Sequence, residues 1–86
     1  MVVYMTHQQH LNRIVLDPQV MVGKPVIRGT RLTVEYILNL LGHGDTIDGI
    51  LAEYEGLTLE DIQACLLFAS QTLESTDFLF LAAEQL

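Results

Sequence analysis

The sequence contains a single cysteine and no tryptophan, so an intramolecular disulfide is excluded and the core must be mainly aliphatic. Cys65 has no histidine or basic residue close to it in sequence, which a catalytic thiol would need, and we expect a small core residue on a helix. One unpaired cysteine fits a reducing compartment.

No apolar run approaches the roughly 20 residues of a membrane span, and no basic leader region is present. We therefore expect a cytoplasmic protein without membrane contact.

Positive charge is scarce and confined to one end of the chain. Lysine and arginine together number four against eleven acids, which gives a net charge of −7. All four cations lie within residues 1–31 beside one acid, whereas residues 32–86 contain ten acids and no cation, so the two parts carry +3 and −10. The second part should repel nucleic acid, and any phosphate contact must come from the first. The candidate anion or nucleic-acid contacts are Arg13, Lys24, Arg28 and Arg31.

The first third of the sequence lacks a helical period. Residues 1–12 are polar and aperiodic, which predicts a partly ordered tail. Between residues 14 and 27, short apolar pieces alternate with turns that contain glycine or proline, a pattern typical of a small β-hairpin or β-arm. A sheet this small must pack against other elements to be stable.

From Thr33 onward the apolar residues recur with the period of a helix. The spacing predicts three helices, over about 34–41, 47–54 and 59–73. The residues predicted to begin or end these helices are Thr33, Gly42, Thr46, Gly56 and Thr58, with Asp61 completing a capping box. A break at residues 75–77 would be followed by a short apolar helix within 76–86.

These elements predict one mainly α domain over residues 13–75, in which a short N-terminal β-arm or hairpin precedes a three- to four-helix bundle. The glycine-containing connection between the second and third predicted helices is typical of a helix-turn-helix. The residues of the terminal helix that would suit a partner groove or a homodimer interface are Phe78, Leu79, Phe80 and Leu81.

Residues 23–31 are the most distinctive stretch, with three cations and two glycines. Arginine can hold a phosphate or carboxylate through paired hydrogen bonds, but the stretch is not a P-loop. Alternatively, Arg28 and Arg31 could pair with acids of the helical part and hold the arm on the bundle.

No catalytic, metal or cofactor site can be assembled from the remaining residues. His7 and His10 lack a third metal ligand, and His43 stands alone between two glycines. A small enzyme is therefore the least favoured function, and we expect no cofactor.

The stretch from Gly23 to Val34, together with Ile14 and Asp17-Pro18, resembles the opening motif of the domain-of-unknown-function 433 family. The stretch from Gly44 to Ile62 resembles that family's second motif in register, and the two motifs cover about residues 13–72. The chain departs from the family pattern at Glu55, where proline is usual.

The resemblance implies a small prokaryotic protein grouped with helix-turn-helix folds, and for some members an antitoxin role against PIN-like ribonuclease toxins. Recognition helices normally carry Arg, Lys, Asn or Gln side chains. Here the corresponding helix begins Leu59-Glu60-Asp61 and offers only Gln63 and Gln71.

Two functions therefore remain. The first is an antitoxin-like module that binds and neutralises a PIN-like ribonuclease toxin. The alternative is a DNA-binding transcriptional regulator that acts as a homodimer through its basic N-terminal arm.

Overall fold

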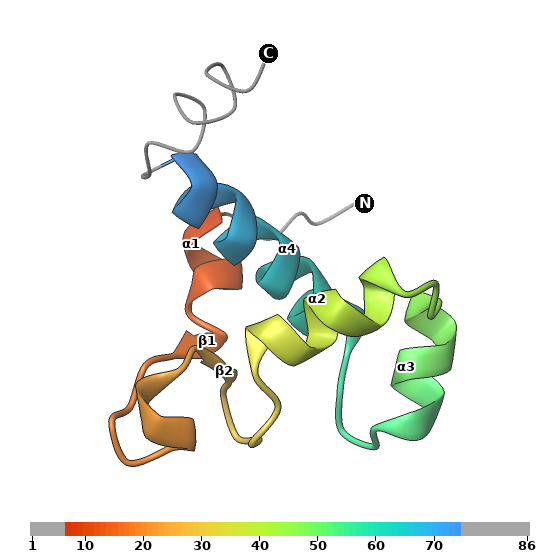
Figure 1. Cartoon of the computed structure of the whole chain (residues 1–86), viewed down its shortest axis with the longest axis horizontal. Coiled ribbons are helices and arrows are strands. Elements are labelled where there is room, and N and C mark those ends of the chain that lie inside the picture. The colour runs from red at the N-terminus through yellow and green to blue at the C-terminus, as the bar shows by residue number, and fades with distance from the viewer. Residues whose placement is uncertain (1–6, 75–86) are drawn as a thin grey trace.

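The structure, a computed structural model, describes residues 7–74 (Figure 1). Its elements are α1 (His7–Leu11), β1 (Ile14–Val15), the 3-10 turn η1 (Met21–Gly23), β2 (Val26–Ile27), α2 (Val34–Gly42), α3 (Ile47–Glu53) and α4 (Leu59–Glu74). The predicted mainly helical fold with a short N-terminal hairpin is confirmed. No helix among residues 7–74 is long and apolar enough to cross a membrane. The helix expected within 76–86, with Phe78, Leu79, Phe80 and Leu81, lies outside the described residues.

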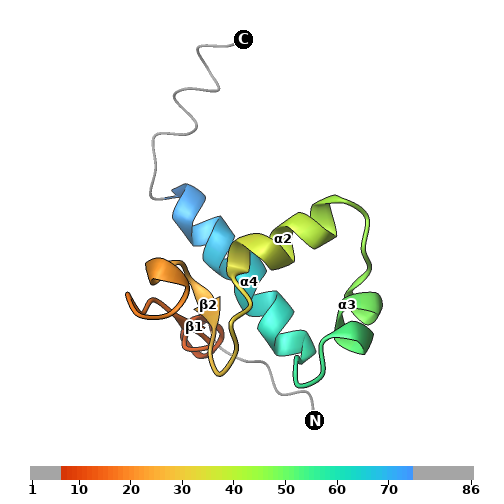
Figure 2. The ribbon, with the colours of Figure 1, turned by 60° about the horizontal axis from the view of Figure 1, so that its bottom comes forward.

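The N-terminal hairpin pairs β1 with β2 in antiparallel register, Ile14 opposite Ile27 and Val15 opposite Val26. Two residues per strand are too few to be stable alone, and the hairpin is held because Ile14 and Ile27 are buried in the common core. The hairpin lies at one end of the molecule and α3 at the other, with α2 and α4 between them (Figures 1 and 2).

The predicted helix N-termini are capped as the sequence indicates. The Thr33 hydroxyl accepts a hydrogen bond from the Tyr36 amide at 3.0 Å, and Thr46 caps α3 in the same way. At the start of α4 the capping box is reciprocal. The Thr58 amide donates to Asp61 Oδ2 at 3.0 Å, and the Asp61 amide donates to the Thr58 hydroxyl at 3.3 Å. Each bond satisfies an amide that the first helical turn leaves unpaired.

The end of α2 differs from the prediction. Gly42 was expected in the left-handed conformation, but it is helical, and Gly44 has φ +100° instead. The reason is a Schellman arrangement: the Gly44 amide donates to the Leu41 carbonyl, and the next amide, that of Asp45, donates to the Leu40 carbonyl. Gly56, which was predicted to end the next helix, follows α3 and is left-handed, with φ +94°.

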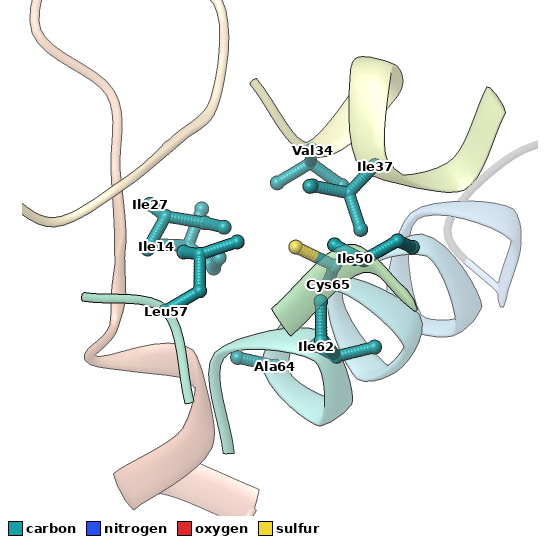
Figure 3. Packing of buried hydrophobic residues seen from close by; sticks show 9 residues of the cluster. All are labelled: Ile14, Ile27, Val34, Ile37, Ile50, Leu57, Ile62, Ala64 and Cys65. Atoms are coloured by element: carbon teal, nitrogen blue, oxygen red, sulfur yellow. The ribbon is translucent and has the colours of Figure 1, made fainter. Parts of the chain in front are cut away.

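Helix α4 forms the centre of the packing and contacts α1, α2, α3 and β1. Side chains from both strands and from α2, α3 and α4 converge on one aliphatic core (Figure 3). Its buried members are Ile14, Ile27, Val34, Ile37, Ile50, Leu57, Ile62, Ala64 and Cys65. Burial raises the pKa of the Cys65 thiol to about 12. The thiol therefore stays protonated and acts as a core residue, as predicted.

Part of the expected N-terminal tail is a helix. Residues 7–11 form α1, which packs on α4. His10 is buried, and its Nε2 lies 3.2 Å from Gln63 Oε1. A five-residue helix is too short to produce a period in the sequence, so tertiary packing alone reveals it.

Candidate functional site

The four predicted contact cations do not act as one group. Arg13 Nη1 lies 3.0 Å from Asp61 Oδ1, and Lys24 Nζ lies 3.0 Å from Glu35 Oε1. The arm is therefore tied to acids of the helical part, but by Arg13 and Lys24 rather than by Arg28 and Arg31. Asp61 can form this ion pair because it lies in the first turn of α4 and its carboxylate is already oriented by the hydrogen bond from the Thr58 amide.

The two cations expected to make those ties are placed differently. Arg28 Nε donates to the Asn12 carbonyl at 2.9 Å, and its side chain is exposed. Arg31 is exposed, and within residues 7–74 it makes no hydrogen bond or ion pair. These two guanidinium groups are the parts of the basic arm left for an external anion.

A polar cavity of about 550 Å³ lies where α1, the hairpin and the start of α4 meet. Its lining residues are Gln9, Asn12, Arg13, Arg28, Gly56, Thr58 and Asp61. The Asp61 carboxylate offsets the charge of Arg13, so Arg28 alone contributes net positive charge. Arg13 Nε is buried and has no hydrogen-bond partner among the described residues. The described lining thus holds one uncompensated cation, Arg28, and does not form a phosphate cradle.

The outward face of α4 carries leucine at every seventh position. Leu59, Leu66 and Leu73 are 43%, 45% and 52% exposed. Gln63 and Ser70 lie between them on the same exposed face, and α4 has no lysine or arginine. Leucine at heptad spacing is typical of a surface that packs on another helix, whereas base reading needs hydrogen-bonding side chains. This face therefore suits a protein contact, and the seven-residue spacing was already visible in the sequence.

An apolar groove of about 570 Å³ lies between α2 and the C-terminal half of α4. Its lining residues are Pro25, Val34, Glu35, Leu38, Asn39, Phe68, Ala69, Thr72 and Leu73. Leu38 and Phe68 are half-buried and rest on the core, so the floor of the groove is fixed by the fold. Leu73 belongs both to the groove and to the leucine row, which makes the two one continuous apolar surface.

The two tyrosines of this region hold α3 against α2. The Tyr36 and Tyr54 hydroxyls are hydrogen-bonded, and the rings meet edge to face with centroids 6.1 Å apart. The hydrogen bond with Tyr36 is the main cause that raises the pKa of Tyr54 to about 12, because it favours the protonated hydroxyl of Tyr54.

Within residues 7–74, no group of three or more His, Cys, Asp or Glu side chains could hold a metal ion.

The family model described as "Protein of unknown function (DUF433)" matches residues 14–69. The chain belongs to the DUF433 family. A crystal structure of a DUF433 member from Anabaena variabilis ATCC 29413 is similar, with 34% sequence identity and a TM-score of 0.70. The similarity covers 78% of this chain and 66% of that chain, so this chain spans just under two thirds of its length. No match was found among curated proteins.

The DUF433 match contains three of the four arm cations and most of the apolar groove. Arg13 lies just before residue 14, and Leu73 lies beyond residue 69. The fold of the hairpin and helices is therefore a property of the family, while Thr72 and Leu73, at the outer end of the groove, lie beyond the matched residues.

Proposed function

We propose that the protein is an antitoxin-like binding module that neutralises a PIN-like ribonuclease toxin. The toxin would contact the docking face, which we define as the α2–α4 groove together with the leucine row of α4. The observation that carries the proposal is the groove itself, an open apolar surface on the rigid part of the fold. Such surfaces on soluble domains mark sites where another protein binds.

Charge supports the same partner. The chain from residue 32 onward holds ten acids and no cation, and Glu35 and Glu74 are exposed near the two ends of the docking face. A ribonuclease with a basic RNA-binding surface would be attracted by this acidic part, which would accelerate association. An acidic module placed over that basic surface would also compete with RNA for it.

Capture from the native host tests the identity of the partner. The full chain, tagged at its N-terminus, is recovered at physiological salt from lysate with and without nuclease treatment. We expect a stoichiometric PIN-like protein that survives the treatment and whose ribonuclease activity falls when the tagged chain is added. Absence of any such protein contradicts the antitoxin role.

A pair of matched variants tests the docking face. Leu73→Asp places a charge in the groove, whereas Leu16→Asp places one on the arm, and both leucines are exposed in the free protein. We expect L73D to bind the toxin at least about tenfold more weakly, because a carboxylate is desolvated in the contact, and L16D to bind normally. Equal binding by both variants would rule out the groove.

One observation favours the DNA-binding alternative. Arg31 is exposed and unpaired within the described part of the chain, and Arg28 is exposed beside it. In a homodimer the doubled arms could contact phosphates on both sides of a helix-turn-helix formed by α3 and α4.

This alternative is tested by measuring the binding of the protein to a DNA duplex by fluorescence anisotropy at several salt concentrations. Arg31→Glu should abolish binding without changing the circular dichroism spectrum, because Arg31 is exposed and has no hydrogen bond or ion pair to lose within residues 7–74. Unchanged binding by R31E would remove the arm as a DNA contact.

A further inference from the structure

The turn η1, Met21–Gly23, forms the tip of the arm and exposes an apolar residue in an unfavourable backbone conformation. Met21 and Val22 have φ +50° and +58°, and Val22 is 93% exposed. A β-branched residue rarely adopts this left-handed region. The turn is nevertheless defined, because the Gly23 amide donates to the Val20 carbonyl and the Lys24 amide donates to the Met21 carbonyl, each at 3.1 Å. Packing within the described fold does not offset the strain at Val22.

A hollow of about 510 Å³ lies directly beside this tip, between the loop and the first half of α2. Its lining residues are Met21, Val22, Lys24, Thr33, Glu35, Tyr36 and Asn39. The exposed ion pair between Lys24 and Glu35 crosses its rim. The same face therefore holds an apolar projection, an apolar hollow and one charge of each sign.

We infer that this tip-and-hollow face docks on a second copy of the chain. A symmetric dimer needs a surface that is complementary to itself, in which each contact occurs twice. Here Val22 of each copy fills the hollow of the other, and Lys24 of each copy meets Glu35 of the other at the rim. Burial of the two Val22 side chains then offsets the backbone strain that the monomer carries.

This dimer face adjoins the docking face proposed for the toxin, but the two have different apolar residues. Glu35 and Asn39 line both hollows and form the ridge between them. The inference therefore does not depend on the proposed function, and a dimer formed in this way leaves Leu38, Phe68 and Leu73 available to another partner.

Sedimentation velocity of the full chain, from micromolar to millimolar concentration, tests the dimer. The wild type should shift from monomer to dimer as concentration rises. Val22→Asn should weaken self-association at least about tenfold, because the polar side chain cannot fill the hollow. The matched control, Leu16→Asn, changes an exposed leucine of the arm that lines neither this hollow nor the docking face, and it should leave self-association unchanged. A wild type that stays monomeric, or a dimer insensitive to V22N, overturns the inference.

Thermal melting at a concentration where the wild type is monomeric separates this effect from misfolding. Asparagine accepts the left-handed conformation more readily than valine, so V22N should melt several degrees above the wild type while it dimerises less well. A melting temperature below that of the wild type overturns the inference, because the tip would then not be strained.

Discussion

The arm, residues 13–33, and the bundle, residues 34–74, follow different physical rules. In the bundle each helix has a cap from its own sequence, and its apolar stripe faces the core. In the arm the strands are two residues long, and Leu16 and Val22 are exposed. The comparison teaches that the bundle stabilises the molecule, while the order of the arm depends on contacts with the bundle.

Two ion pairs join these regions, and they are not equivalent. The side chains of Arg13 and Asp61 are 34% and 10% exposed, whereas those of Lys24 and Glu35 are 57% and 73% exposed. Water screens the second pair far more than the first. The link near the hairpin base is therefore structural, and the link near the arm tip is free to exchange partners.

The largest effect is expected from a cavity in the bundle. Ile62 is fully buried at the centre of α4, so Ile62→Ala should lower the free energy of unfolding by roughly 2–5 kcal/mol. Leu16→Ala, in the arm, removes an exposed side chain and should change it by less than about 0.5 kcal/mol. Urea denaturation measures both. A comparable loss for the two variants would break the distinction between bundle and arm.

The stability of the bundle should fall at alkaline pH. Burial raises the pKa of Cys65 from 9.0 to about 12, so the folded state keeps a proton that the unfolded state releases. The protonated Cys65 thiol therefore contributes fully to the free energy of unfolding below pH 9. Above pH 9 this contribution declines by about 1.4 kcal/mol per pH unit as the pH rises toward the folded pKa. Urea midpoints across this range test it.

Two variants distinguish the contribution of Cys65 to this pH dependence from that of Tyr54. In Cys65→Ala the decline between pH 9 and 10 should disappear. Tyr54→Phe should affect only the decline above pH 10, since the pKa of Tyr54 is raised from 10.0 to about 12. A decline between pH 9 and 10 that persists in C65A would show that another group causes it.

The two ion pairs should give unequal coupling energies in double-mutant cycles. Alanine substitutions of Arg13 and Asp61 should show a coupling of about 1–2 kcal/mol, because Asp61 is largely shielded from water. The same cycle for Lys24 and Glu35 should give about 0–0.5 kcal/mol. Added salt should reduce the second value more than the first, and equal couplings would contradict the difference in burial.

The smallest effects are expected from a change to asparagine at one exposed position in each region. Val22→Asn relieves strain in the arm and should raise the free energy of unfolding by about 0.5–1 kcal/mol. Leu66→Asn places a poorer helix former in the middle of α4 and should lower it by about 0.5 kcal/mol. Urea denaturation of dilute protein distinguishes the signs. A lower free energy of unfolding for Val22→Asn would mean that the arm tip carries no strain.

Much of the bundle could be predicted because its signals are local. Thr33, Thr46 and Thr58 each cap a helix through an amide three residues away or fewer, so their role depends on sequence spacing alone. The left-handed glycine after α2 was misplaced by two residues, since its position depends on which carbonyls accept the last amides. Helix α1 was missed because five residues cannot establish a period.

The candidate site could be predicted only in part. The arm was expected to be tied to the helical part, but its partners were wrong, because Arg13 and Asp61 are 48 residues apart and only the fold brings them together. The groove was missed for the same reason, since Leu38 and Phe68 belong to different helices. The predicted interface residues Phe78, Leu79, Phe80 and Leu81 lie outside the described residues and stay a prediction.

The sequence by itself determined the three longer helices, their N-terminal caps, the separation of charge and the membership of the DUF433 family, because these depend on neighbouring residues or on motif spacing. Only the tertiary structure decided which cations remain available, where apolar side chains leave a groove, and that the arm tip is strained. Those features arise from contacts between residues far apart in the chain, and no local pattern encodes them. For this protein, the local sequence therefore specifies the stable bundle, and the packing of distant segments creates the surfaces on which a partner can bind.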